Sequence, residues 1–136
     1  MSFRYVTFDE ALLVITAVHD KNPLDYIRDT VLLQSALERP AATLFGRDAY
    51  PDVYAKGAAL LHSTLRNHAL LDGNKRTGWV LCVLFFQLNG YEEHYDENGM
   101  FDFVLAVAAG EIAEIGDIAQ RLADWFTKRS PTSPAG

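Results

Sequence analysis

The chain has 136 residues, 49% of them hydrophobic, and 12 basic against 18 acidic side chains give it a formal net charge of −6. This length fits a single domain, expected over residues 1–129, and the acidic balance argues against direct binding of nucleic acid by phosphate neutralisation. Residues 1–10 lack the apolar segment of a signal peptide, and the longest apolar run, residues 79–86, is far shorter than the roughly 20 residues that cross a bilayer. The composition therefore predicts a cytoplasmic protein without a membrane partner.

Apolar residues recur at helical spacing along most of the chain, and no segment gives a convincing sheet signal. The first helix is expected to start after Thr7, and the second ends at Arg39-Pro40, because proline disfavours a helical residue before it. Residues 41–50 form a connector in which a two-stranded flap is only weakly indicated. Helices are expected at about 8–19, 28–38, 52–67, 74–89, 99–109 and 115–128, with a polar loop at 91–98 and a disordered tail at 130–136.

The segment 74–89 contains the run WVLCVLFFQL, which is apolar on nearly all sides. A helix of this kind belongs in the centre of a bundle. Cys82 lies within the run, is the chain's one cysteine and is interpreted as a small core residue. The predicted fold class is therefore all-α, a compact bundle around the 74–89 helix.

The segment that points to chemistry is HALLDGNKRT, residues 68–77, which joins two predicted helices. The first turn of a helix presents unpaired N–H groups and the positive end of the helix dipole, so it favours an anion. Gly73 admits a ligand close to the backbone, and Lys75 and Arg76 add two positive charges suited to phosphate oxygens. This half of the segment predicts a polyphosphate site.

Two further side chains supply the other parts of a phosphoryl or nucleotidyl transfer. Asp72 can hold a magnesium ion that bridges phosphate oxygens, and His68 can take a proton from an incoming hydroxyl. A structural alternative stays open at each position. Asp72 can cap the following helix, Lys75 and Arg76 can form a solvated pair, and His68 can be a structural histidine at a helix end.

The segment 68–77 is similar to the signature of the Fic/Doc family, His-x-Phe-x-x-Gly/Ala-Asn-Gly/Lys-Arg. Four other stretches, LLQSALERP, FGRDAYP, QLNGY and GEI, resemble the Doc-type pattern in the same order, so the likeness covers roughly residues 5–127. It implies the compact Fic/Doc helical bundle, with His68 as the general base and Asp72 as the magnesium ligand. It also implies contacts to the nucleotide phosphates from Gly73, Asn74 and Arg76.

Lys75 separates two activities within the family. Adenylyl-transferring members usually carry glycine at this position, whereas lysine goes with a reversed nucleotide whose terminal phosphate faces the histidine. The resemblance therefore implies a toxin that uses ATP, or another nucleoside triphosphate, and Mg²⁺ to phosphorylate a protein hydroxyl. The family target is a threonine of elongation factor Tu, whose modification arrests translation. A protein adenylyltransferase and a catalytically silent interaction module remain the alternatives.

Two positions depart from the family pattern. The phenylalanine of the signature is Leu70 here, and this apolar replacement should anchor the loop nearly as well. Autoinhibited members carry a glutamate where this chain has Arg39, so we expect no self-inhibition. Restraint would come instead from a Phd-type antitoxin, disordered until it binds a groove near residues 28–50.

Other candidate residues receive structural interpretations. His19-Asp20 resembles a family-typical pair at the end of the first helix and is interpreted as structural. His94 lies among carboxylates, in what we expect to be a solvated loop rather than a metal site. Arg66 either helps to order the site or is a surface arginine.

Overall fold

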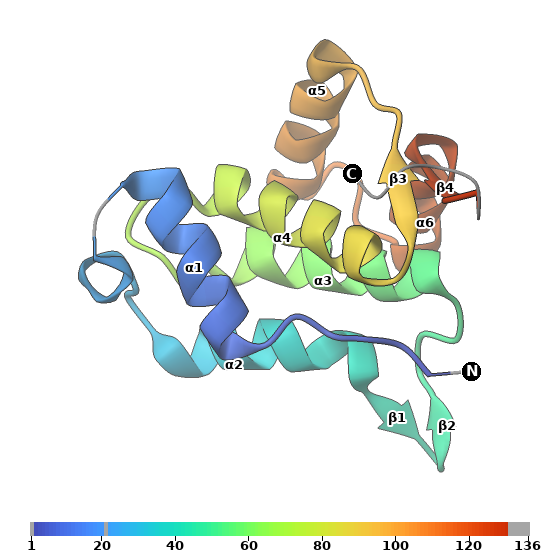
Figure 1. Ribbon diagram of the computed structural model, residues 1–136, viewed down its shortest axis with the longest axis horizontal. Coiled ribbons are helices and arrows are strands. Elements are labelled where there is room, and N and C mark those ends of the chain that lie inside the picture. The colour runs from blue at the N-terminus through green and yellow to red at the C-terminus, as the bar shows by residue number, and fades with distance from the viewer. Residues whose placement is uncertain (1, 21, 131–136) are drawn as a thin grey trace.

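The computed structural model describes residues 2–20 and 22–130, and helices dominate these residues (Figure 1). This confirms the predicted all-α class. The helices are α1 (Phe8–His19), α2 (Thr30–Glu38), α3 (Val53–Asn67), α4 (Asn74–Leu88), α5 (Glu97–Ala108) and α6 (Ile115–Trp125), with short 3₁₀ turns η1 (Pro23–Asp25) and η2 (Arg39–Ala41). The short strands are β1 (Thr43–Leu44), β2 (Arg47–Asp48), β3 (Tyr91–Glu93) and β4 (Phe126–Lys128).

Side-chain caps set where the helices begin. At α1 the Thr7 hydroxyl accepts from the Glu10 N–H at 3.1 Å, and the Glu10 carboxylate accepts from the Thr7 N–H at 3.0 Å, which completes a capping box. Asp52 caps α3 in a similar way. At α2 the Asp29 carboxylate accepts from two backbone N–H groups, so the helix begins at Thr30 and not at the expected residue 28.

Helices α3 and α4 lie side by side at the centre of the fold, α1 packs on α4, and α2 and α6 pack on α3 (Figure 1). Gly57 of α3 permits the close approach, because a Cβ there would lie 2.6 Å from the Phe86 ring of α4. Cys82 is fully buried, as predicted, and burial raises the pKa of its thiol. The buried α4 therefore provides a fixed base for its own N-terminal turn. In the described residues no helix has both the length and the apolar character that a membrane span requires.

The strand pair β3–β4 corrects two predictions. Residues 91–93 were expected in a polar loop and residues 126–128 at the end of a helix, yet they pair in antiparallel register. The pairing follows from tertiary packing, since Phe126 is fully buried and its ring stacks on Phe86 at 4.2 Å between centroids. Because the two strands lie more than 30 residues apart, the sequence around either strand does not indicate that they pair.

The weakly indicated flap is present as the antiparallel pair β1–β2, with Thr43 opposite Asp48. The buried Lys56 of α3 fixes it to the core, since Lys56 Nζ donates to the Pro40 carbonyl at 3.1 Å and pairs with Asp48 Oδ2 at 3.2 Å. The predicted disordered tail lies, apart from Ser130, outside the described residues.

Candidate functional site

The loop between α3 and α4 is framed by two residues with left-handed backbone. His68 ends α3 with φ 50° and ψ 47°, and Gly73 precedes α4 with φ 76°. A left-handed conformation is uncommon for a residue with a Cβ and occurs often at functional sites, where the surrounding structure holds it. In this chain the contacts that hold His68 come from the segment before α2.

Arg28 holds the backbone at His68. Its guanidinium donates to the His68 carbonyl from Nε at 2.9 Å and from Nη2 at 2.6 Å, and a longer bond from Nη2 reaches the Asn67 carbonyl at 3.4 Å. These bonds satisfy carbonyls that the end of α3 leaves without helical partners. Sequence reasoning missed Arg28, because it lies 40 residues from His68 and its role depends on the tertiary fold.

The backbone of the loop is tied to the same segment. The Arg28 N–H donates to the Ala69 carbonyl at 2.8 Å, and the Leu71 N–H donates to the Tyr26 carbonyl at 2.8 Å. Leu70, between them, is buried with 4% of its surface exposed. The expectation that an apolar residue anchors the loop at this position is confirmed.

Asn74 completes the loop from the first position of α4. Its Oδ1 accepts from the Leu70 N–H at 3.0 Å, and its Nδ2 donates to the Leu70 carbonyl at 2.9 Å. The amide side chain is thus engaged with the loop, which leaves the backbone N–H groups of this turn to meet an anion.

Gly73 is packed against His19. A Cβ built on Gly73 would lie 2.5 Å from His19 Cε1, a distance that real Cβ atoms do not tolerate. The His19 ring also stacks on Tyr26 with centroids 3.9 Å apart, so it packs against the loop, in keeping with its structural interpretation. Within the described part of the chain, His19 Nε2 is buried and has no hydrogen-bond partner.

The three charged residues of the loop segment, Asp72, Lys75 and Arg76, are exposed, and their side chains have no hydrogen bond or ion pair within the described residues. Asp72 does not cap α4, because Gly73 is the capping residue and no side chain caps this end. All three line a cavity of about 500 Å³ between α4 and α5, called here the α4–α5 cavity. Its other lining residues are Gly73, Asn74, Trp79, Val80, Met100, Phe101, Val104 and Leu105.

His68 lines a second cavity of about 500 Å³, which adjoins the first along α5 and is called here the histidine cavity. The other lining residues are Lys75, Asp102, Leu105, Ala106, Ala108, Ala109 and Glu111. Lys75 and Leu105 belong to both cavities. Lys75 is therefore the charged side chain that connects the candidate base with the candidate phosphate donors.

A magnesium ion fits this arrangement. Among the described residues no group of three or more histidine, cysteine or carboxylate side chains could hold a metal on its own. Mg²⁺ in phosphate chemistry takes one or two carboxylates and completes its shell with water and phosphate oxygens, and Asp72 offers such a carboxylate beside the cationic turn. His94 makes no such site; its Nε2 lies 2.8 Å from Thr127 Oγ1.

Arg66 and Arg39 both have structural partners. Arg66 Nη1 donates to the Ala108 carbonyl at 2.6 Å, which ties the end of α3 to the end of α5 beside the histidine cavity. Arg39 binds the Tyr50 hydroxyl, His62 Nδ1 and the Ser63 hydroxyl, all within 2.9 Å. Burial, reinforced by the charges of Arg39 and Arg66, lowers the pKa of His62 below its usual 6.5.

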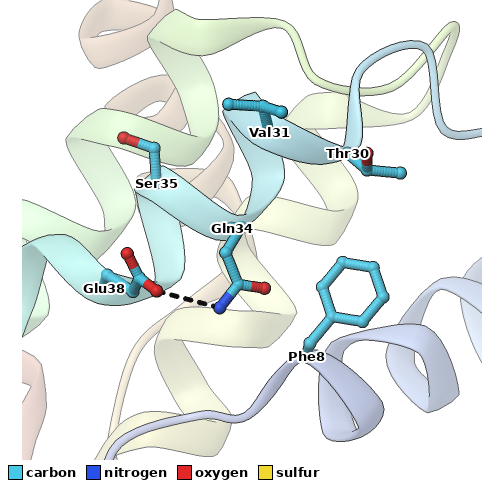
Figure 2. Close-up of a pocket in the computed structure, with 6 residues that line it drawn as sticks. All are labelled: Phe8, Thr30, Val31, Gln34, Ser35 and Glu38. Atoms are coloured by element: carbon cyan, nitrogen blue, oxygen red, sulfur yellow. Dashed lines mark hydrogen bonds between the residues drawn. The ribbon is translucent and has the colours of Figure 1, made fainter.

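A third hollow, of about 410 Å³, lies between α1 and α2 (Figure 2). It is called here the α1–α2 groove, and it is lined by Phe8, Thr30, Val31, Gln34, Ser35 and Glu38. Gln34 and Glu38 are joined by a 3.0 Å hydrogen bond, and 74% of the surface of Val31 is exposed. The groove falls in the region where the sequence predicted a partner-binding face.

Comparison with known proteins gives two matches. The family model described as Fic/DOC family matches residues 10–86, which is more than half of the chain and contains the whole loop. A protein named Toxin Doc, from Mycolicibacterium smegmatis (strain ATCC 700084 / mc(2)155), is 43% identical over 99 residues, which are 71% of this chain and 75% of that protein.

Proposed function

Since the chain belongs to the Fic/DOC family, we propose that it is the toxin of a toxin–antitoxin pair and transfers the terminal phosphate of a nucleoside triphosphate to a protein hydroxyl. One observation carries the proposal. Three charged side chains that have no partner among residues 2–20 and 22–130, namely Asp72, Lys75 and Arg76, lie at the first turn of a buried helix, and Lys75 connects them to the cavity of His68. A base, a metal ligand and phosphate donors are the parts that phosphoryl transfer requires.

Each residue of the loop has its own role in the proposed reaction. His68 takes the proton of the acceptor hydroxyl while the hydroxyl oxygen bonds to the terminal phosphorus, and the bond from that phosphorus to the bridging oxygen breaks, so a nucleoside diphosphate leaves. Arg76 and the first N–H groups of α4 bind phosphate oxygens, and Lys75 offsets negative charge on the transferred group. Mg²⁺, held by Asp72, supplies further charge neutralisation when bound.

Lys75 favours phosphoryl over adenylyl transfer. Lys75 lines the cavity beside the first turn, at the position where the glycine of adenylyl-transferring members would leave space for the inner phosphates. The proposed acceptor is a threonine of elongation factor Tu, and its modification would arrest translation in the cytoplasm. Adenylyl transfer at the same loop is the second candidate activity, favoured by the presence of a second cavity beside His68 large enough for a nucleoside.

The decisive experiment is intact-mass spectrometry of purified elongation factor Tu after incubation with this protein, ATP and Mg²⁺. The proposal expects the mass of one phosphoryl group with the wild type and none with His68→Ala, whose folding is verified by circular dichroism. The mass of an adenylyl group would contradict kinase activity and support the second candidate. No added mass would contradict this target, and labelled ATP in a whole lysate then decides between another target and a silent module.

For the antitoxin we propose the α1–α2 groove as the docking site. Its exposed apolar side chain, Val31, and the Phe8 ring offer a surface for one apolar helix of a Phd-type partner. Val31→Asp should weaken binding of the antitoxin, measured by calorimetry with the co-encoded partner, whereas Leu13→Asp, also at an exposed apolar position of the α1–α2 region but outside the groove, should not. Equal affinities for the two variants would contradict this docking site.

A further inference from the structure

A small cavity of about 10 Å³ lies between α2, α3 and α4 and is bordered by the loop residues Ala69 and Leu70. Its walls are mostly apolar, and every lining residue except the half-buried Asn74 is buried. Two hydroxyl groups line it, those of Thr64 from α3 and Thr77 from α4, and it is called here the threonine cavity. The proposed reaction assigns no role to either hydroxyl.

The two hydroxyls differ in their hydrogen bonds. The Thr64 hydroxyl donates to the Leu60 carbonyl of its own helix at 3.0 Å, which is the usual partner of a threonine inside a helix. The Thr77 side chain is 2% exposed, and within the part of the chain that the structure describes its hydroxyl has no hydrogen-bond partner. The carbonyl four residues earlier, of Gly73, already accepts the Thr77 backbone N–H at 2.9 Å. A buried hydroxyl left without any partner lowers the folding equilibrium constant by about ten- to a hundredfold, so a partner is expected in the cavity.

We propose that the threonine cavity binds one water molecule, which bridges the hydroxyls of Thr77 and Thr64. The volume of about 10 Å³ matches the roughly 10–15 Å³ that a single water requires. The Thr77 hydroxyl donates to the water oxygen, and the water donates to the Thr64 oxygen, whose own hydrogen is given to α3. Asn74 Nδ2 has a second hydrogen beyond the one that it gives to the Leu70 carbonyl, and it donates this hydrogen to the same water. These partners fall within the number that a buried water requires.

A dry cavity is the rival interpretation. Cavities that exclude water are lined by apolar groups throughout, whereas this one presents a hydroxyl from each of two helices and an amide from the loop side. The helices approach closely beside it, since a Cβ on Gly78 would lie 2.8 Å from Thr64 Oγ1. The water therefore joins α3, which ends at His68, to the first turns of α4 at the point where Asn74 holds the loop.

Thr77→Val tests for the water through the sign of a stability change. Valine has the shape of threonine without the hydroxyl, so it removes one partner of the bound water, and the midpoint of thermal unfolding should fall by about 3–6 °C. In a dry cavity the same change would remove an unsatisfied hydroxyl, and the midpoint would rise. Thr16→Val is the control, because Thr16 is exposed and its hydroxyl bonds to the Leu12 carbonyl of its own helix. Its midpoint should stay close to that of the wild type.

A high-resolution crystal structure of the protein supplies the direct measurement. A water oxygen should lie about 2.5–3.0 Å from both Thr77 Oγ1 and Thr64 Oγ1 in the wild type. Thr77→Ser, which keeps the hydroxyl, should retain this water. The inference is overturned if the wild-type cavity holds no water, or if Thr77→Val unfolds at a higher temperature than the wild type. Should Thr77→Val fail to fold, the structures of the wild type and of Thr77→Ser still decide.

Discussion

The side chain of Asn74 makes both of its loop hydrogen bonds to a single residue, Leu70, at 3.0 Å to the N–H and 2.9 Å to the carbonyl. The pair closes the end of the loop onto the first residue of α4. A second asparagine does the same at the other end of this helix, where Asn89 binds the N–H and carbonyl of Arg4 at 2.9 and 2.8 Å. The two amides perform the same structural task, but only one of them borders the α4–α5 cavity.

Asn74→Asp should weaken phosphate binding by more than its loss of folding stability can explain. The carboxylate cannot donate to the Leu70 carbonyl, which costs about 1–3 kcal/mol of unfolding free energy, and it places a negative charge beside the phosphates. Asn89→Asp is the matched control, with a similar loss of stability and unchanged binding of tripolyphosphate. Denaturant unfolding and calorimetry measure the two effects. Equal binding losses in both variants would refute the assignment of the phosphate site to this turn.

Gly73→Ala should destabilise the loop for two separable reasons. A residue with a Cβ in the left-handed region costs about 1–2 kcal/mol, and its Cβ would meet His19 Cε1 at 2.5 Å. His19→Ala in the same chain removes the collision and leaves the backbone strain. A double-mutant cycle on the free energy of unfolding should therefore show that Gly73→Ala costs less when His19 is absent. Strict additivity would mean that the two residues do not collide.

How far the sequence predicts the molecule depends on the range of each interaction. The start of α1 after Thr7 and the loop at residues 68–77 were predicted, because caps and motifs are local. The β3–β4 pair and the Arg28–His68 contact were not, because each joins segments more than 30 residues apart. The left-handed backbone of His68 also had no signal of its own, since it is imposed by the contacts around it.

His62 should make the fold less stable in acid. Arg39 Nη1 donates to His62 Nδ1 at 2.8 Å, so the ring must be neutral there to accept, and burial and the nearby arginines lower its pKa below 6.5. The unfolded chain then binds a proton that the folded chain resists, so stability is present above about pH 6.5 and is lost as the pH falls through the folded pKa. Urea unfolding at about pH 7.5 and about pH 5.5 should show a smaller loss for His62→Gln than for the wild type. His94→Gln, at an exposed histidine, serves as the control and should lose as much stability in acid as the wild type. A loss in His62→Gln as large as the loss in His94→Gln would contradict the prediction.

Arg28 should act as a positioning residue for His68. Its guanidinium fixes the carbonyl of His68, whose backbone has the rare left-handed conformation. Arg28→Ala should therefore displace the His68 imidazole from its position beside the acceptor hydroxyl. A displacement near 1 Å can cost about a hundredfold in rate, so kcat for transfer to the target should fall by about ten- to a hundredfold. The dissociation constant for tripolyphosphate should stay unchanged, because Arg28 lines neither cavity. Arg28→Lys, which retains one donor to the His68 carbonyl, should recover part of kcat. A purely structural role would instead lower kcat and phosphate affinity together, in step with the loss of unfolding free energy, and the lysine variant would then recover both or neither.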